Sequence, residues 1–195
     1  MKLTTPNLLT LTRIAAAPVL VYLLTFPQPI PSLAAAGVFF VATVTDFLDG
    51  YIARSYGSGS NLGKILDPLA DKLLVAAALI MLAATTREPR VPAWIVVVMV
   101  SREILVTGLR AVAANRGRIL AAEELGKYKM ALQSVAIHGL LIHYVWFHVD
   151  FFAAGMFLLW IAMVVTVWSG VDYFVRMWDV IAPRTRPPIA RRAAV

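Results

Sequence analysis

Four aspartates occur within one short stretch of the chain, DFLDGYIARSYGSGSNLGKILDPLAD. Asp46 and Asp49 are three residues apart, and Asp67 and Asp71 are four residues apart. In a helix, each of these spacings places the two side chains on one face, and the loop between the pairs can fold the two helix ends together. We therefore expect the four carboxylates to converge.

Such a group of acids predicts a metal centre. Ligands that are all carboxylates favour hard cations such as Mg²⁺ or Mn²⁺. Two ions suit a displacement at phosphorus, because they stabilise both the attacking and the leaving oxygen. The alternative is a salt-bridged helix junction, in which the aspartates pair with Arg54, Lys64 and Lys72. That alternative explains neither the number of acids nor their phasing.

The rest of the chain predicts a membrane setting for these acids. Of its 195 residues, 60% are hydrophobic and only 15% are charged, which is far more apolar than a soluble domain. Apolar stretches of about 20 residues, long enough to cross a bilayer, cover residues 8–26, 33–53, 67–85, 92–109, 130–149 and 151–174. The breaks between them carry turn residues, such as Pro27, Pro29 and Pro31 in the first and Gly57, Gly59 and Gly63 in the second. We expect an all-α polytopic membrane protein of six transmembrane helices, forming one domain over residues 1–195.

The basic residues predict how this bundle is oriented. All 18 Lys and Arg residues except Arg87 and Arg90 fall on the side of the bundle that holds the aspartates. By the positive-inside rule that side is cytoplasmic, together with both termini and a basic tail over about residues 176–195. Topology and contacts with anionic lipid account for the net charge of +7, so we expect membrane lipid and no nucleic acid as a partner. The chain has no cysteine, which excludes disulfides and thiolate metal sites.

The pattern Asp46-x2-Asp49-Gly50-x2-Ala53-Arg54-x8-Gly63-x3-Asp67-x3-Asp71 resembles the signature of the CDP-alcohol phosphotransferase family at each of its eight fixed positions. The resemblance implies six transmembrane helices around a cytoplasm-facing polar cavity, a homodimer, and two Mg²⁺ or Mn²⁺ ions per active site. It also implies transfer of a substituted phosphoryl group from a CDP-alcohol to a second alcohol, with release of CMP. Carried over by position, it makes metal ligands of Asp46, Asp49, Asp67 and Asp71, with Asp71 also the candidate general base, and assigns the cytidine diphosphate pocket to Gly50, Ala53, Arg54 and Gly63.

Other stretches narrow the expected acceptor. PNLLTLTR, SREILVTGLR, GKYKMALQ and WSGVDYF resemble the bacterial inner-membrane members of the family that use CDP-diacylglycerol and glycerol 3-phosphate. Four cations in these stretches would bind the acceptor phosphate through charge-assisted hydrogen bonds: Arg102, Arg110, Lys127 and Lys129. The expected reaction is a direct displacement in which the sn-1 hydroxyl of glycerol 3-phosphate attacks the β-phosphorus of CDP-diacylglycerol and loses its proton toward Asp71.

Three alternatives remain open at this point. A sibling enzyme could use inositol phosphate as the acceptor, or could use phosphatidylglycerol to make cardiolipin. A cation transporter could line a permeation path with the same acids, although these acids cluster at one membrane face and no inverted pair of broken helices is evident.

Overall fold

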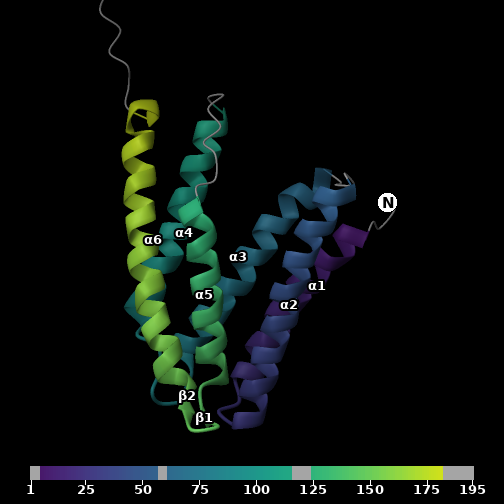
Figure 1. Ribbon diagram of the computed structural model, residues 1–195, viewed down its shortest axis with the longest axis vertical. Helices are drawn as coiled ribbons and strands as arrows, with labels where there is room; N and C mark the ends of the chain where they lie inside the picture. Colours follow the sequence, from purple (N-terminus) through teal and green to yellow (C-terminus); the bar gives the residue numbers. More distant parts are fainter. Residues whose placement is uncertain (1–4, 57–60, 116–123, 182–195) are drawn as a thin grey trace, which may run out of the picture.

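The computed structural model describes the backbone of residues 5–56, 61–115 and 124–181, and the side chains of residues 11–45, 69–115 and 129–178. Within these ranges the chain forms six helices and one small hairpin (Figure 1). In chain order they are α1 Thr5–Leu24, α2 Pro29–Tyr56, α3 Asn61–Ala84, α4 Ala93–Asn115, α5 Glu124–Ile142, β1 Val145–Trp146, β2 Val149–Asp150 and α6 Phe151–Ile181.

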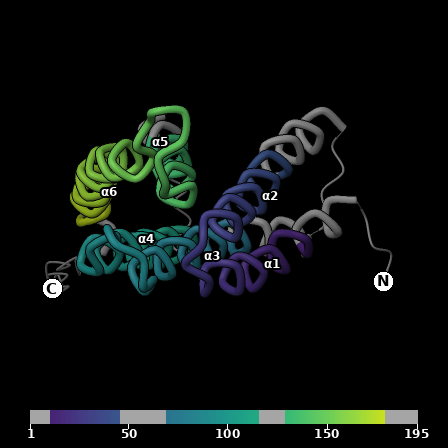
Figure 2. Tube along the Cα trace, turned by 90° about the horizontal axis from the view of Figure 1, so that it is seen from below, coloured from purple at the N-terminus to yellow at the C-terminus, as the bar shows by residue number. Residues whose placement is uncertain are grey.

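The six helices lie in two layers of three. Seen along the bundle, α6, α5 and α2 form one row, and α4, α3 and α1 form the other (Figure 2). The helix contacts agree with this arrangement, since α5 packs against α6 and α2 within one layer, α3 packs against α1 and α4 within the other, and α6 lies over α4. The two ends of the bundle differ, because the helices converge near the hairpin and spread apart toward the opposite end (Figure 1).

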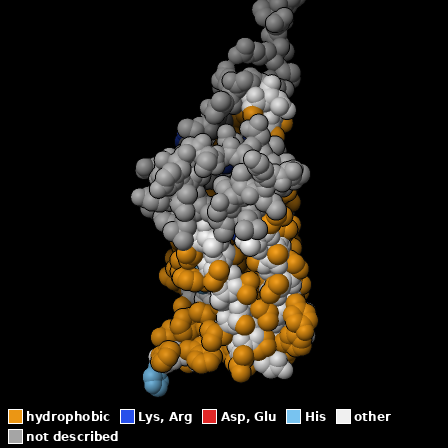
Figure 3. All heavy atoms as spheres, turned by 90° about the vertical axis from the view of Figure 1, so that its right-hand side faces the viewer, with side chains coloured by type: hydrophobic (Ala, Val, Ile, Leu, Met, Phe, Trp, Pro, Cys, Tyr) orange, Lys and Arg blue, Asp and Glu red, His pale blue; other side chains and the backbone are white. Residues whose placement is uncertain are grey.

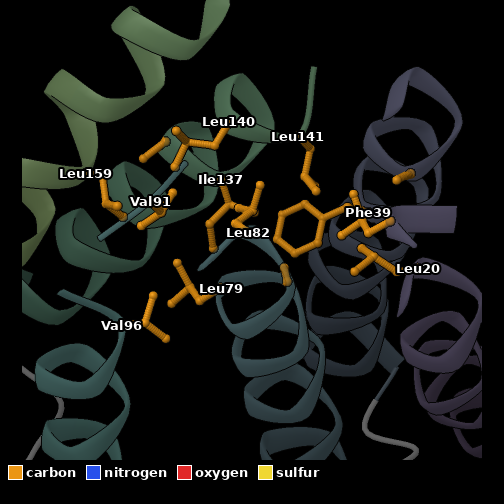
Figure 4. Packing of buried hydrophobic residues seen from close by; sticks show 14 of the residues in the cluster. Leu20, Phe39, Leu79, Leu82, Val91, Val96, Ile137, Leu140, Leu141 and Leu159 are labelled. Atoms are coloured by element: carbon orange, nitrogen blue, oxygen red, sulfur yellow. The ribbon is translucent and has the colours of Figure 1, made fainter. Parts of the chain in front are cut away.

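The hydrophobic core fills the convergent end. Leu20, Phe39, Leu82, Ile137 and Leu159 come from five different helices, and all are at most 1% exposed. Figure 4 shows the Phe39 ring among leucine and isoleucine side chains from the neighbouring helices. The core therefore joins the two layers near the hairpin.

Two glycines allow α5 and α6 to come into close backbone contact. A Cβ atom added to Gly155 would lie 2.7 Å from the backbone nitrogen of Leu140 and 3.0 Å from the carbonyl oxygen of Ala136. A Cβ on Gly139 would lie 3.0 Å from the Cα of Gly155. Small residues at such crossings let membrane helices pack closely, where dispersion contacts replace the missing hydrophobic driving force.

A buried polar cluster closes the same end of the bundle. Arg87, in the α3–α4 loop, is 4% exposed and donates from Nε to Thr85 Oγ1 at 3.1 Å and from a second nitrogen to the Ser32 hydroxyl. Ser32, in the first turn of α2, donates in turn to the carbonyl oxygen of Leu141 at 2.6 Å. Burial lowers the pKa of His143 and the nearby charge of Arg87 lowers it further, so that the imidazole is neutral at pH 7. This cluster ties together α2, the α3–α4 loop and the end of α5.

The fifth apolar stretch departs from our expectation. We predicted one helix over residues 130–149, but α5 ends at Ile142 and the hairpin follows. His143 has a φ of 66°, and the two residues at the tip of the hairpin, Phe147 and His148, have φ values of 51° and 63°. Positive φ at both central residues is the requirement of a tight type I′ hairpin turn. The apolar character of this stretch therefore concealed a turn.

Other boundaries also moved. Pro29 and Pro31 were expected in a break but lie in the first turn of α2, where a missing N–H costs nothing. Gly63 was likewise expected in a break and lies within α3. At the other end of the chain α6 begins at Phe151, as predicted, with the Asp150 carboxylate accepting a hydrogen bond from the backbone of Ala153 at 2.9 Å.

The all-α architecture is confirmed, and one of its helices meets the length and composition of a membrane span. In the described part of the chain this helix covers Phe151–Trp178, while Leu11–Leu24, Pro29–Thr45 and Lys129–Ile142 are shorter apolar segments. The helix α4 carries three charged residues, Arg102, Glu103 and Arg110, within its otherwise apolar sequence. Hydrophobic side chains nevertheless cover much of the described part of the face shown in Figure 3. Large apolar side chains of other helices are exposed as well, with Val97 of α4 62% and Trp168 of α6 71% exposed. An apolar surface of this extent suits lipid rather than water.

The glycine contact generates the first prediction. Replacing Gly155 with alanine should destabilise the fold by about 1–3 kcal/mol, because the backbone of α5 must move to accept the new methyl group. The control is Gly37→Ala in α2, where an added Cβ meets nothing within 4 Å. Thermal unfolding in detergent should place the midpoint of Gly155→Ala well below that of wild type, with Gly37→Ala unchanged or slightly higher. Equal midpoints for the two variants would show that the α5–α6 contact is not close-packed.

Candidate functional site

The four aspartates lie on two consecutive helices. Asp46 and Asp49 are in the last three turns of α2, and Asp67 and Asp71 are in the first three turns of α3. Of these four side chains the structure describes Asp71 alone. Gly50, Ala53, Arg54, Gly63 and Lys127 are also outside the described side chains. The predicted metal site and cytidine diphosphate pocket therefore stay predictions, and the described residues by themselves contain no group of three or more acids or histidines that could hold a metal.

A carboxylate that we did not predict lies at the centre of the described part of the site. Glu103, on α4, accepts a hydrogen bond from Arg102 at 3.0 Å and forms an ion pair with Lys129 of α5 through the same oxygen atom. The side chains of Lys129 and Arg102 are 5% and 13% exposed, whereas that of Glu103 is 28% exposed. A buried cation needs a partner of this kind, because taking a charge out of water is costly.

Residues of α3 extend this cluster. Lys72 donates a hydrogen bond to the hydroxyl of Thr107 on α4. The carboxylate of Asp71 lies near enough to attract both Lys72 and Lys129, and Lys72 also experiences repulsion from Arg102 and Arg110. Asp71 therefore shares its surroundings with the cations that we expected to bind the acceptor phosphate.

The last helix completes the cluster. Arg102 donates to the Ser169 hydroxyl of α6 at 2.7 Å. The guanidinium of Arg110 lies over the ring of Tyr173, with its central carbon 5.5 Å from the ring centroid, which is a cation–π contact. Four helices thus contribute to one polar region, at the end of the bundle away from the hairpin.

The structure brings together part of the predicted set. Arg102 lies within electrostatic reach of both Arg110 and Lys129, and the carboxylate of Asp71 attracts Lys129. Sequence analysis overlooked Glu103, Ser169 and Tyr173 as members of the site. Glu103 did carry a signal, since it is an ionisable residue inside an otherwise apolar helix, and such residues are functional or paired by default.

The arrangement is suited to binding an anion. Among its described residues, the cluster contains four cations, Lys72, Arg102, Arg110 and Lys129, and two carboxylates, Asp71 and Glu103. Asp172, which precedes Tyr173 on α6, pairs with Arg176 at 3.0 Å. Guanidinium and ammonium groups in partly dehydrated surroundings form strong hydrogen bonds with phosphate oxygens. These described cations would attract a phosphate group.

Comparison with known proteins shows which sequences this chain is similar to. A family sequence profile described as CDP-alcohol phosphatidyltransferase matches residues 3–168. A Bacillus subtilis protein named CDP-diacylglycerol--glycerol-3-phosphate 3-phosphatidyltransferase is 42% identical, over 90% of this chain and 96% of its own length. A protein of the same name from Rickettsia bellii is 37% identical, over 87% of this chain and 92% of its own. A rice protein named cardiolipin synthase (CMP-forming) is 35% identical over 92% of this chain, which spans 59% of the rice protein.

The ion pair between α4 and α5 generates the second prediction. Replacing Glu103 with alanine leaves the buried ammonium of Lys129 without its carboxylate, and an unsatisfied buried group of this kind costs about 1–3 kcal/mol. Unfolding in detergent, followed by circular dichroism, should therefore give a lower midpoint for Glu103→Ala than for wild type.

Two further variants test the cause. Glu88→Ala removes an exposed pair with Arg90, which contributes little, and should leave the midpoint unchanged. The double variant Glu103→Ala with Lys129→Met removes both buried charges and should recover part of the loss. If Glu103→Ala unfolds at the same midpoint as Glu88→Ala, the pair does not stabilise the bundle.

Proposed function

The chain belongs to the CDP-alcohol phosphatidyltransferase family, and on this premise we propose that it transfers the phosphatidyl group of CDP-diacylglycerol to glycerol 3-phosphate, with release of CMP. The products are phosphatidylglycerol phosphate and CMP. The observation that carries the choice of acceptor is the similarity, over about nine-tenths of the chain, to relatives whose names specify glycerol 3-phosphate. Because the family consists of membrane-bound enzymes, we prefer a phosphatidyltransferase to the alternative of a cation transporter.

The cation cluster supports a phosphorylated acceptor. Glycerol 3-phosphate carries a phosphate dianion that must approach the carboxylate of Asp71. Without nearby cations this dianion would be repelled by the carboxylate, but Lys72 and Lys129 both lie close enough to Asp71 to interact with it. In the proposed complex, Arg102, Arg110 and Lys129, together with Lys127, bind the acceptor phosphate.

The reaction we propose is a single displacement. Asp71 accepts the proton of the sn-1 hydroxyl, the hydroxyl oxygen bonds to the β-phosphorus, and the bond from that phosphorus to the oxygen of CMP breaks. Asp46, Asp49, Asp67 and Asp71 have the all-carboxylate chemistry that fits Mg²⁺ or Mn²⁺. Two such ions would supply neutralisation of the diphosphate charge. The chain's own contribution is to position the acceptor and to hold complementary charge around it, which is the usual source of acceleration in phosphoryl transfer.

The proposed function also includes an arrangement of the chain in the membrane. We propose six transmembrane helices around a polar cavity, with the active site and both termini on the cytoplasmic side of the bacterial inner membrane, and a homodimer as the assembled form. The charge bias supports this orientation, since Arg87 and Arg90 lie in the α3–α4 loop at the hairpin end of the bundle, away from the cation cluster. The acyl chains of CDP-diacylglycerol would then remain in the lipid beside the apolar outer surface.

A panel of acceptors tests the proposed function and provides the third prediction. The purified enzyme, supplied with CDP-diacylglycerol, should release CMP with glycerol 3-phosphate. The value of kcat/KM for phosphatidylglycerol should be at least about a hundredfold lower than for glycerol 3-phosphate. Phosphatidylglycerol has a phosphodiester in place of the phosphate dianion, and each hydrogen bond to that dianion contributes about 1.5–3 kcal/mol. Inositol phosphate, which keeps the phosphate but changes the alcohol, is the third arm.

The preferred acceptor in this assay identifies the activity of the enzyme. Preference for phosphatidylglycerol would favour cardiolipin synthesis, the activity in the name of the rice relative. Preference for inositol phosphate would favour the other sibling enzyme. Either result would contradict the choice of glycerol 3-phosphate while leaving the family assignment intact.

The aspartates generate the fourth prediction. Asp71→Asn should lower turnover by at least about a hundredfold, the usual contribution of a general base, while the protein remains folded. Asp46→Asn, Asp49→Asn and Asp67→Asn should abolish activity, and excess chelator should do the same to the wild type. Asp150→Asn is the matched control, because asparagine also caps a helix and this position is at the far end of the bundle. Near-normal turnover in any of the four variants, or a rate that chelator leaves unchanged, would contradict the metal-dependent mechanism.

A further inference from the structure

The side chain of Arg102 lies against the backbone of α6. A Cβ atom added to Gly170 would lie 3.1 Å from Cγ and 3.1 Å from Nε of Arg102, and 3.7 Å from its Cδ. These three atoms belong to the outer part of the arginine stem, so the stem crosses α6 at a glycine, a position without a side chain. Any other residue at position 170 would have to share this space with Arg102.

The guanidinium beyond the stem is held at both of its terminal nitrogens. One of them donates to the Ser169 hydroxyl at 2.7 Å, and the other donates to Glu103 at 3.0 Å. The Nε atom between the stem and the terminal nitrogens is buried and makes no hydrogen bond, consistent with its position beside Gly170. The plane and depth of the guanidinium are therefore determined by α6 on one side and by Glu103 on the other.

This placement matters because Arg102 shares Glu103 with Lys129. The same carboxylate oxygen binds the ammonium group of Lys129, so a displaced guanidinium would change its distance from that ammonium. The two cations repel each other, and their separation depends on both anchors. A guanidinium in a fixed plane can also offer two parallel N–H groups to a phosphate, which a mobile one does less well.

We propose that α6 is the positioning element for Arg102, with Gly170 providing the space for its stem and Ser169 holding its guanidinium, so that the pair sets the affinity for the acceptor phosphate. This inference rests on the proposed function, in which Arg102 binds that phosphate. Gly170 and Ser169 act through Arg102 and do not themselves contact substrate.

Steady-state kinetics with each substrate varied in turn tests the proposal and is the fifth prediction. Gly170→Ala should raise the KM for glycerol 3-phosphate about threefold to tenfold, because it displaces the guanidinium by a few tenths of an ångström and a misplacement of about 1 Å can cost a hundredfold. Ser169→Ala should have a similar effect through loss of one hydrogen bond. The KM for CDP-diacylglycerol should stay within about twofold in both variants, since the change in free energy acts only on the acceptor phosphate. The control is Gly108→Ala on α4, where an added Cβ meets nothing within 4 Å.

A double-mutant cycle separates positioning from a general effect on folding. In an Arg102→Ala background, Gly170→Ala should produce no further rise in the KM for glycerol 3-phosphate, because the side chain that it displaces is gone. Full additivity of the two substitutions, or equal changes in both KM values, would overturn the proposal. So would an unchanged acceptor KM in Gly170→Ala.

Wild-type enzyme measured in the same assay distinguishes a failure of the positioning role of α6 from a failure of the proposed function. If the wild type is active with glycerol 3-phosphate and Gly170→Ala has the same kinetics, the positioning role of α6 is contradicted and the proposed function stands. A wild type that releases no CMP with glycerol 3-phosphate would contradict the proposed function, and this inference with it.

Discussion

Charged side chains buried in an apolar bundle need hydrogen-bonding or oppositely charged partners, and in this protein a single oxygen of Glu103 binds two cations, one from α4 and one from α5. Lys129 reaches it from α5 and Arg102 from the adjacent position on α4. Without this carboxylate the two positive charges would repel each other in surroundings where water screens them poorly. The polar end of the bundle depends on this contact, because it allows cations of α4 and α5 to lie close together. Among the residues of this cluster whose side chains the structure describes, the cations outnumber the carboxylates, which suits a phosphorylated substrate.

The opposite end of the bundle has a different task. There the Gly139–Gly155 contact, the leucine-rich core and the buried Arg87 hold the helices together. Because these contacts lie near the hairpin, they leave the far ends of the helices free to spread, as Figure 1 shows. A closed base with polar residues at the spread end is a sensible design for a membrane enzyme, since the base supplies stability while the other end positions the chemistry. The helix α6 takes part in both, through Gly155 at the base and through Ser169 and Gly170 beside Arg102.

Much of the fold could be predicted from hydrophobicity alone. A backbone in lipid must satisfy its hydrogen bonds internally, so long apolar stretches become helices, and all six expected helices are present among the described residues. The start of α6 was also correct. The errors fell where apolar residues form something other than a helix, since Val145, Phe147 and Val149 belong to a hairpin. Hydrophobicity reports the solvent that a residue prefers, and it does not report the sign of φ.

The sequence by itself determined the chemical character of the candidate site. Aspartates at helical spacing, and the cations that follow them along the chain, already predict acid and phosphate chemistry, because the spacing of side chains within a helix is set by its 3.6-residue turn. Only the tertiary structure decided which of these groups meet. Glu103 is adjacent to Arg102 in the sequence, but its partnership with Lys129 arises from the packing of α4 against the rest of the bundle. The pairing of Arg102 with Ser169 and Gly170 likewise joins residues of α4 and α6 that are far apart along the chain. Contacts between helices depend on how whole helices cross and rotate, and this is a property of many residues together that no local spacing encodes.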